Sequence, residues 1–157
     1  MREIKNIVVE NARIVFKNFS GEERQFNPKG KRNFCLLISP DDADRLKAEG
    51  WNIKALKARE EGDMDQPYLP VEVRYGQYPP KVVMVTSKNQ TVLDEEMVAI
   101  LDTAEITNVD VVVRPFEWEP GRLKAYVKTM YVTIAEDEFE SKYETPAPAL
   151  NTEDDLW

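Results

Sequence analysis

Alternating hydrophobic and polar residues dominate the first 135 positions of the chain. Apolar side chains recur at every second position in residues 6–19, 32–38, 106–117 and 122–134, which is typical of β-strands that bury one face. Residues 6–19 are predicted to be one long strand or two strands joined by a bulge. The last two segments flank Glu119-Pro120-Gly121, a turn sequence, and are therefore predicted to form a hairpin.

One further pair of segments and one single short strand complete the predicted β-structure. Residues 68–75 and 81–87 are expected to form a second hairpin around Gly76 to Pro80, and residues 51–58 are expected to form a short strand. Residues 20–31 and 59–67 are charged or polar and are predicted to be loops.

The signals for helices are confined to two places. Ser39 is a good N-cap, Pro40 suits the first helical position, and Gly50 is a typical helix stop, so a helix is expected between them. A second, short helix is predicted from Asp94 to Leu101.

This element order predicts a mainly β protein. Strands joined by hairpins, with one or two short helices inserted and no strand-helix alternation, favour an OB-type five-stranded β-barrel. The barrel is assigned to residues 1–135. Residues 136–157 lack the pattern, contain Pro146-Ala147-Pro148-Ala149, and are predicted to be a largely disordered acidic tail.

The net charge of −8 comes almost entirely from that tail. Residues 136–157 contain eight acidic residues and one basic residue, a net charge of −7, whereas residues 1–135 carry −1. Within the body, residues 1–35 have a surplus of four positive charges, and residues 92–110 contain six acids and no base. The total charge therefore does not argue against a polyanionic partner, because it averages two regions of opposite character.

Several classes of protein are excluded or disfavoured by composition. The chain has no histidine, which excludes Ser-His-Asp and Cys-His catalysis, and its single cysteine, Cys35, excludes an internal disulfide. The six glycines never form a nucleotide-binding motif, so no cofactor is expected. No apolar run is long enough for a signal peptide or a membrane span, which leaves a soluble, cytoplasmic, non-enzymatic protein as the expectation.

Basic and aromatic residues share the polar faces of three predicted strands and one loop. Cations at strand spacing can follow a phosphate backbone, and exposed rings can stack on unpaired bases of any identity. The pattern therefore predicts sequence-independent binding of single-stranded DNA (ssDNA). The cations predicted to bind phosphates are Arg13, Lys17, Arg24, Lys29, Lys31, Arg32, Arg114, Arg122, Lys124 and Lys128. Some of Phe19, Phe26, Phe116, Trp118 and Tyr126 are predicted to stack on bases.

Other aromatic residues fit the core better. Phe16, Phe34 and Tyr75 fall on apolar faces of predicted strands, and Trp51 follows a helix stop, so all four are expected to be buried.

Two alternative functions stay open at this level. One is a metal-dependent nuclease that uses carboxylates in residues 94–110, although acids near a helix N-terminus are commonly solvated. No metal site is predicted, because the signal is weak; its candidates would be Asp94, Glu95, Glu96, Asp102, Glu105 and Asp110. The other alternative is a protein-interaction module that does not bind DNA.

The chain ends in Glu153-Asp154-Asp155-Leu156-Trp157, three acids followed by an apolar pair. A terminal tryptophan and carboxylate can be captured by a basic, apolar pocket of another protein. The tail is therefore predicted to bind partner proteins. Its acids could also occupy the protein's own basic surface and compete with DNA.

Four segments make the chain similar to the ssDNA-binding proteins of tailed bacteriophages, which are OB-fold proteins with an acidic C-terminal tail. These segments are residues 11–19, 26–34, 78–81 and 121–128, and the tail ends in Leu-Trp where bacterial ssDNA-binding proteins have Pro-Phe. The resemblance implies a protein that coats and protects ssDNA in phage replication, recombination or repair, in the cytoplasm of the host cell. It also implies that the tail recruits replication or recombination proteins, and it leaves homo-oligomers open.

Overall fold

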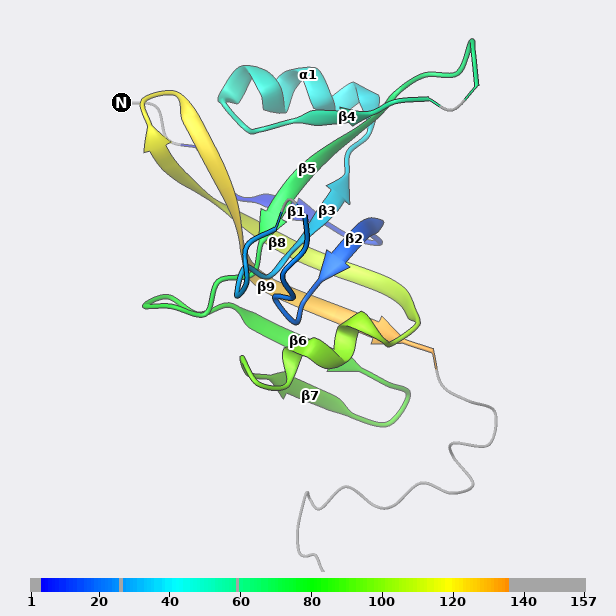
Figure 1. Ribbon diagram of the computed structural model, residues 1–157, viewed down its shortest axis with the longest axis vertical. Coiled ribbons are helices and arrows are strands. Elements are labelled where there is room, and N and C mark those ends of the chain that lie inside the picture. Colours follow the sequence, from blue (N-terminus) through cyan, green and yellow to red (C-terminus); the bar gives the residue numbers. More distant parts are fainter. Residues whose placement is uncertain (1–3, 26, 59, 136–157) are drawn as a thin grey trace, which may run out of the picture.

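The computed structural model describes residues 4–25, 27–58 and 60–135. Within these residues the chain forms strands, one α-helix and one 3-10 helix around a β-barrel (Figure 1). The elements in chain order are β1 (Ile7–Val9), β2 (Ile14–Asn18), β3 (Asn33–Leu37), α1 (Pro40–Glu49), β4 (Lys54–Leu56), β5 (Gln66–Glu72), β6 (Lys81–Val85), β7 (Gln90–Leu93), η1 (Val98–Asp102), β8 (Ile106–Glu119) and β9 (Arg122–Ile134).

The sheet closes on itself through the N-terminal segment. Its strand order is β1-β8-β9-β5-β3-β2, so both ends of the sheet belong to the same stretch of chain. Between β1 and β2, the Ala12 amide donates to the Val109 carbonyl (2.7 Å), and the Arg13 carbonyl accepts from the Leu37 amide (2.9 Å). Counting β1 and β2 as one bent strand gives a five-stranded barrel in which β5 and β9 pair in parallel. This is the OB-type arrangement that the sequence predicts.

Alternation along the strands supplies the core of this barrel. Inward-facing residues of β3, β5, β8 and β9 are buried, among them Phe34, Leu69, Val111 and Leu123. Phe34 and Trp51 are 1% and 2% exposed, which confirms the predicted burial of both rings.

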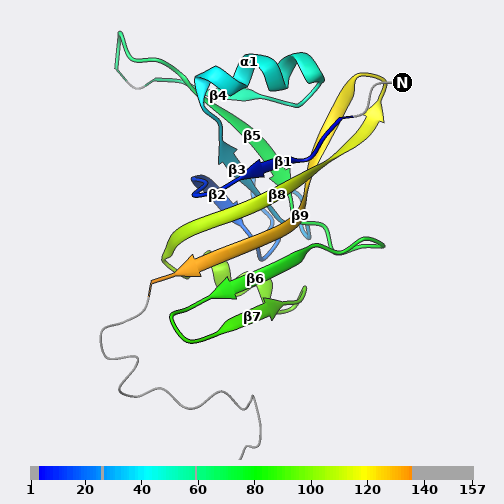
Figure 2. The ribbon, with the colours of Figure 1, turned by 180° about the vertical axis from the view of Figure 1, so that it is seen from behind.

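Helix α1 begins and ends where its capping residues predict. The Ser39 hydroxyl accepts from the Asp42 amide (3.3 Å), and Gly50 ends the helix with a positive φ of 108°. The chain after this end reaches the tip of the β8–β9 hairpin, since the Gly50 carbonyl accepts from the Leu123 amide (3.0 Å). The yellow hairpin and α1 accordingly lie side by side in both ribbon views (Figures 1 and 2). The helix end thus holds the hairpin tip against the barrel.

A bulge in β2 reverses two predicted aromatic roles. The pairing of β2 with β3 shifts between Val15 and Asn18, and Phe16 adopts a left-handed φ of 54°. Because one extra residue inverts the alternation, Phe16 is 63% exposed, whereas Phe19 is fully buried against Phe34 with ring centroids 5.7 Å apart. The predicted core position of Phe16 and the predicted stacking role of Phe19 are therefore both wrong.

The predicted hairpin of residues 68–75 with 81–87 is also wrong. Strands β5 and β6 do not pair with each other; both pair in parallel with β9, opposite Tyr126 and opposite Thr129 to Thr133, respectively. The hairpin partner of β6 is β7, across a turn in which the Thr86 amide donates to the Asn89 carbonyl (2.9 Å). Strand β9 is long enough for one of its edges to pair with β5 and then, further along, with β6.

The remaining predictions are confirmed in outline or lie outside the described residues. Strands β8 and β9 form the predicted hairpin. The predicted short helix is a 3-10 helix that begins at Val98, after a turn in which the Asp94 carboxylate accepts from the Met97 amide (2.9 Å). The acidic tail, residues 136–157, lies outside the described residues.

Candidate nucleic-acid interface

A continuous hollow runs between the β2–β3 loop, the end of α1, strand β5 and the β8–β9 hairpin. It consists of two adjoining cavities of about 460 Å³ each, which share Lys31, Glu72 and Lys124 among their lining residues. We call the two cavities together the basic groove. Its lining includes seven cationic side chains and two carboxylates: Lys29, Lys31, Arg32, Lys47, Arg74, Arg122 and Lys124, with Glu72 and Glu95.

Trp118 lies at one end of the basic groove, on the hairpin. Its side chain is 45% exposed, and Arg122 Cζ and Lys124 Nζ each lie 5.7 Å from the ring centroid. The hairpin tip is ordered by local contacts: the Gly121 amide donates to a Glu117 carboxylate oxygen (3.1 Å). A half-exposed indole between two cations offers a surface for a base next to two charges for its phosphates.

Tyr126 supports the hairpin instead of offering a free ring. It is 4% exposed, Arg114 Cζ lies 5.0 Å from its ring centroid, and the Phe116 ring packs on it with centroids 5.8 Å apart. The Arg74 guanidinium donates to the Tyr126 hydroxyl (3.4 Å). The predicted stacking role of Tyr126 is therefore wrong, because its ring is covered. Phe116, 47% exposed on the hairpin, remains accessible. Phe26 lies outside the described residues.

Arg32 is held by a carboxylate at the floor of the basic groove. Its Nη1 lies 3.2 Å from Glu95 Oε2, and its side chain is only 18% exposed. Its Nε is buried and has no hydrogen-bond partner within the described part of the chain. Nearby, burial raises the pKa of Tyr75 to about 12, so its hydroxyl stays protonated and donates to the Leu93 carbonyl (3.0 Å). Glu95 thus occupies a place next to Arg32 that a phosphate could take.

The other predicted cations lie outside the basic groove. Arg13 and Lys17 line a separate hollow beside the start of β8, where Lys17 Nζ donates to the Ala104 carbonyl (2.8 Å). Arg24 is exposed and lies 3.8 Å from a Glu22 carboxylate oxygen. Arg114 and Lys128 line a further hollow beside the β5–β6 loop. The structure thus brings five of the ten predicted phosphate-binding residues together: Lys29, Lys31, Arg32, Arg122 and Lys124.

Two groove residues were not predicted from the sequence. Lys47 lies in the last turn of α1, and Arg74 follows β5. A lysine near a helix C-terminus interacts favourably with the helix dipole, so the position of Lys47 does not by itself indicate a binding role. Arg74 has no aromatic residue two positions away on a polar strand face, so it lacks the pattern on which the other cations were predicted. Only the docking of the α1 end onto the hairpin tip places Lys47 beside Trp118.

Three of the six carboxylates considered for a nuclease, Asp94, Asp102 and Asp110, accept hydrogen bonds from backbone amides. Asp102 accepts from the amides of Phe19 (2.7 Å) and Ser20 (2.8 Å), and Asp110 accepts from the Asn11 amide (2.9 Å). Among residues 4–25, 27–58 and 60–135, no three His, Cys, Asp or Glu side chains are grouped so that they could hold a metal ion.

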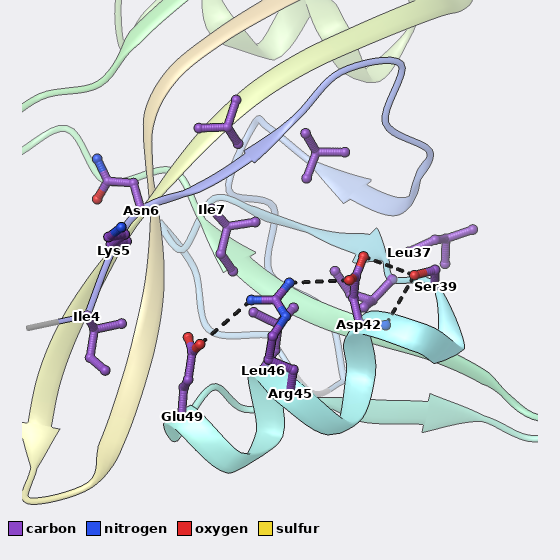
Figure 3. A pocket seen from close by; sticks show the side chains of 13 residues that line it. Ile4, Lys5, Asn6, Ile7, Leu37, Ser39, Asp42, Arg45, Leu46 and Glu49 are labelled. Atoms are coloured by element: carbon purple, nitrogen blue, oxygen red, sulfur yellow. Dashed lines mark hydrogen bonds and ion pairs between the residues drawn. The ribbon is translucent and has the colours of Figure 1, made fainter.

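A separate cavity of about 590 Å³ lies between β1 and α1 (Figure 3). Apolar side chains such as Ile7 and Leu46 share its lining with Arg45, which lies between Asp42 (3.2 Å) and Glu49 (3.6 Å). Hydrogen bonds from Ser39 and Arg45 lower the pKa of Asp42. The lining has two cations, Lys5 and Arg45, and two carboxylates, Asp42 and Glu49, so this cavity lacks the surplus of positive charge that a polyanion needs. In the described part of the chain, no helix is long and apolar enough to span a membrane.

A family model described as "Putative phage ssDNA-binding domain" matches residues 1–155. Among solved structures, the chain is similar to a C-terminal truncation of the single-stranded DNA-binding protein from bacteriophage Enc34. The two are 16% identical with a TM-score of 0.46, over 87% of this chain and 94% of the other. No curated protein matches the chain.

Proposed function

The chain belongs to the phage ssDNA-binding domain family, and we propose that it binds ssDNA in the basic groove without sequence preference. The observation that carries this proposal is the gathering of seven cations in one groove that has a half-exposed tryptophan at its end. Cations bind phosphates whatever the base, and every base has a π-face that can stack on Trp118. Such a surface binds an unpaired DNA strand whatever its base sequence.

The exposed rings favour single strands over duplex DNA. Trp118 and Phe116 present their rings from the β8–β9 hairpin, and each is nearly half exposed. In a duplex, both faces of an internal base are covered by its neighbours, so these rings would have no partner there. In an unpaired strand, each stacked base is worth about 1–3 kcal/mol.

Tryptophan fluorescence tests this function directly. The chain has three tryptophans, so the titration uses a Trp157→Phe background, in which Trp51 is 2% exposed and Trp118 is 45% exposed. In that background, quenching by oligothymidylate should report on Trp118. Log Kobs should fall with log[salt] with a slope of about −3 to −5, the range for four to seven phosphate contacts. A Trp118→Phe variant should keep most of the affinity, measured by fluorescence anisotropy of labelled DNA, but lose most of the quenching. Absence of both quenching and salt dependence would refute the proposal.

Removal of the Glu95 charge should strengthen DNA binding. Glu95→Gln frees Arg32 for a phosphate. The Glu95 side chain is 55% exposed, and an ion pair that solvent reaches is worth about 0.2–1 kcal/mol, so the gain should be up to about fivefold at low salt. The same titration of Glu96→Gln is the matched control, because Glu96 is exposed, adjacent in sequence and absent from the groove lining. Equal affinities of the two variants would show that Glu95 does not compete with DNA.

We further propose that the protein coats and protects ssDNA during phage replication, recombination or repair in the host cytoplasm. Membership of the family supports DNA binding. A groove that binds ssDNA of any base sequence suits a protein that coats strands wherever they are unwound, and this is the basis for the accessory role. The acidic tail and its terminal Leu156-Trp157 would recruit replication or recombination proteins. Capture of such proteins by the full chain, and its loss when residues 153–157 are deleted, would support this role; capture that survives the deletion would contradict it.

Deletion of residues 136–157 should tighten DNA binding. The deletion removes a charge of −7, which otherwise repels DNA and can occupy the basic groove. We expect a gain of about tenfold at low ionic strength that vanishes near 1 M salt, where the Debye length is about 3 Å. Anisotropy titrations of the full and truncated chains across a salt series measure it. Unchanged or weaker binding by the truncated chain at low salt would contradict self-competition.

A further inference from the structure

A second basic hollow lies one residue further along β9 than the groove: Tyr126 lines the groove, and Val127 and Lys128 line the hollow. It has a volume of about 580 Å³ and lies where the β5–β6 loop projects from the barrel (Figures 1 and 2). Its lining residues are Asn6, Gln77, Tyr78, Pro79, Arg114, Val127 and Lys128.

The chemistry of this hollow suits a nucleotide. It has two cationic side chains, Arg114 and Lys128, and no carboxylate among its lining residues. Tyr78 is 71% exposed, so its ring is free to receive a base. Asn6 and Gln77 each carry an amide that can donate or accept, so either can meet the edge of any base.

Arg114 is already fixed in place for this role. Its guanidinium lies 5.0 Å from the centroid of the buried Tyr126 ring, which restricts the side chain before any ligand arrives. A cation that is ordered in the free protein loses less conformational entropy when it binds a phosphate. Lys128, exposed on β9, provides a second, more mobile charge.

The hollow continues the path of the basic groove. Residues 73–79 and strand β9 line both cavities. Each segment contributes first to the groove and then, further along the sequence, to the hollow. In the groove they contribute Val73 to Tyr75 together with Lys124 and Tyr126; in the hollow they contribute Gln77 to Pro79 together with Val127 and Lys128. A strand that leaves the groove past Tyr126 therefore has the hollow, which has no carboxylate in its lining, as the next cavity along β9.

We propose that this hollow is a second nucleotide-binding subsite, in which Tyr78 stacks on a base and Arg114 and Lys128 bind the flanking phosphates. The inference rests on the proposed function and extends it, because the subsite lengthens the stretch of ssDNA that one protein molecule covers. Short oligonucleotides fill the groove alone, and only longer ones reach Tyr78.

The test compares oligothymidylates of two lengths. OB domains cover about 4–16 nucleotides, so one oligonucleotide of about 4 and one of about 16 bracket the range. Tyr78→Ala should bind the short oligonucleotide like the wild type and the long one about 5- to 150-fold more weakly, the loss of one stacked base. Lys128→Ala should weaken only the long complex and reduce its salt slope by about 0.7. Tyr78→Phe should restore the affinity of the long complex.

Two controls make the outcomes distinct. Met64→Ala removes a side chain that is 78% exposed and lines neither the hollow nor the groove, so this variant should bind both lengths like the wild type. Trp118→Ala should weaken both complexes, because Trp118 lines the groove.

If Tyr78→Ala binds both lengths normally while Trp118→Ala does not, the subsite is refuted and the proposed function stands. If Tyr78→Ala weakens both lengths equally, Tyr78 belongs to the groove and the extension is refuted. If the wild type binds neither, the proposed function itself fails.

Discussion

Simultaneous replacement of Lys31, Arg122 and Lys124 by alanine is expected to weaken ssDNA binding about 100-fold at 0.1 M salt. These three cations line the cavity that contains Trp118, and all are exposed. Each phosphate contact to single-stranded DNA contributes about 0.7 to the salt slope, so the variant should lose about 2 from the slope. Over the decade between about 0.1 and 1 M salt, that difference amounts to two powers of ten in affinity.

A matched triple variant separates this loss from a general change of charge. Lys5, Lys54 and Lys57 are also exposed cations, and none of them lines the basic groove or the Tyr78 hollow. Their replacement by alanine changes the net charge equally but should leave the slope almost unchanged. Anisotropy titrations over a salt series measure both variants. If the two lose affinity to the same extent, DNA responds to total charge and the groove has no special role.

Gly50→Ala is expected to destabilise the fold and weaken DNA binding together. A Cβ at position 50 would lie 2.5 Å from the Gly121 carbonyl oxygen, a backbone atom at the hairpin tip. The left-handed φ of 108° adds a penalty of about 1–2 kcal/mol for any residue with a side chain. The clash adds about 1–3 kcal/mol of overpacking unless the hairpin moves away. Movement of the hairpin would carry Trp118, Arg122 and Lys124 away from Lys31.

Gly62→Ala provides the control for backbone strain. Gly62 has a similar φ of 95°, but a Cβ there would meet nothing within 4 Å. Urea unfolding should therefore show a loss of about 1–2 kcal/mol for Gly62→Ala and a larger loss for Gly50→Ala. DNA affinity should fall only in Gly50→Ala. Equal unfolding free energies and equal affinities of the two variants would mean that the contact between helix end and hairpin does not shape the groove.

Features encoded by neighbouring residues could be predicted from the sequence. Helix α1 depends on Ser39, Pro40 and Gly50, all within twelve positions, and its bounds are as expected. The β8–β9 hairpin likewise follows from its own turn, Glu119-Pro120-Gly121. The exposure of Trp118 was open to prediction for the same reason, since a hairpin tip offers little core in which to bury a ring.

Two predictions about the β-structure were wrong. One failed because of the conformation of a single residue, and the other because of pairing with a strand distant in sequence. The left-handed conformation of Phe16 inverts the alternation in β2, and nothing in the residue type announces it, since phenylalanine rarely adopts positive φ. Strands β5 and β6 have the alternation of a hairpin, yet both pair with β9. Alternation shows that a strand has a buried face but carries no information about which strand lies beside it.

By itself, the sequence determined most of the elements (β7, Gln90–Leu93, was not predicted), the kind of barrel they build, and a supply of cations and exposed rings larger than the site needs. The tertiary structure decided which of them share a surface. Lys31, Lys47, Arg74 and Trp118 come from four separate segments of the chain, and they meet because the end of α1 docks on the hairpin tip and β5 pairs with β9. Those contacts join residues tens of positions apart, so no local pattern of polar and apolar residues could reveal them.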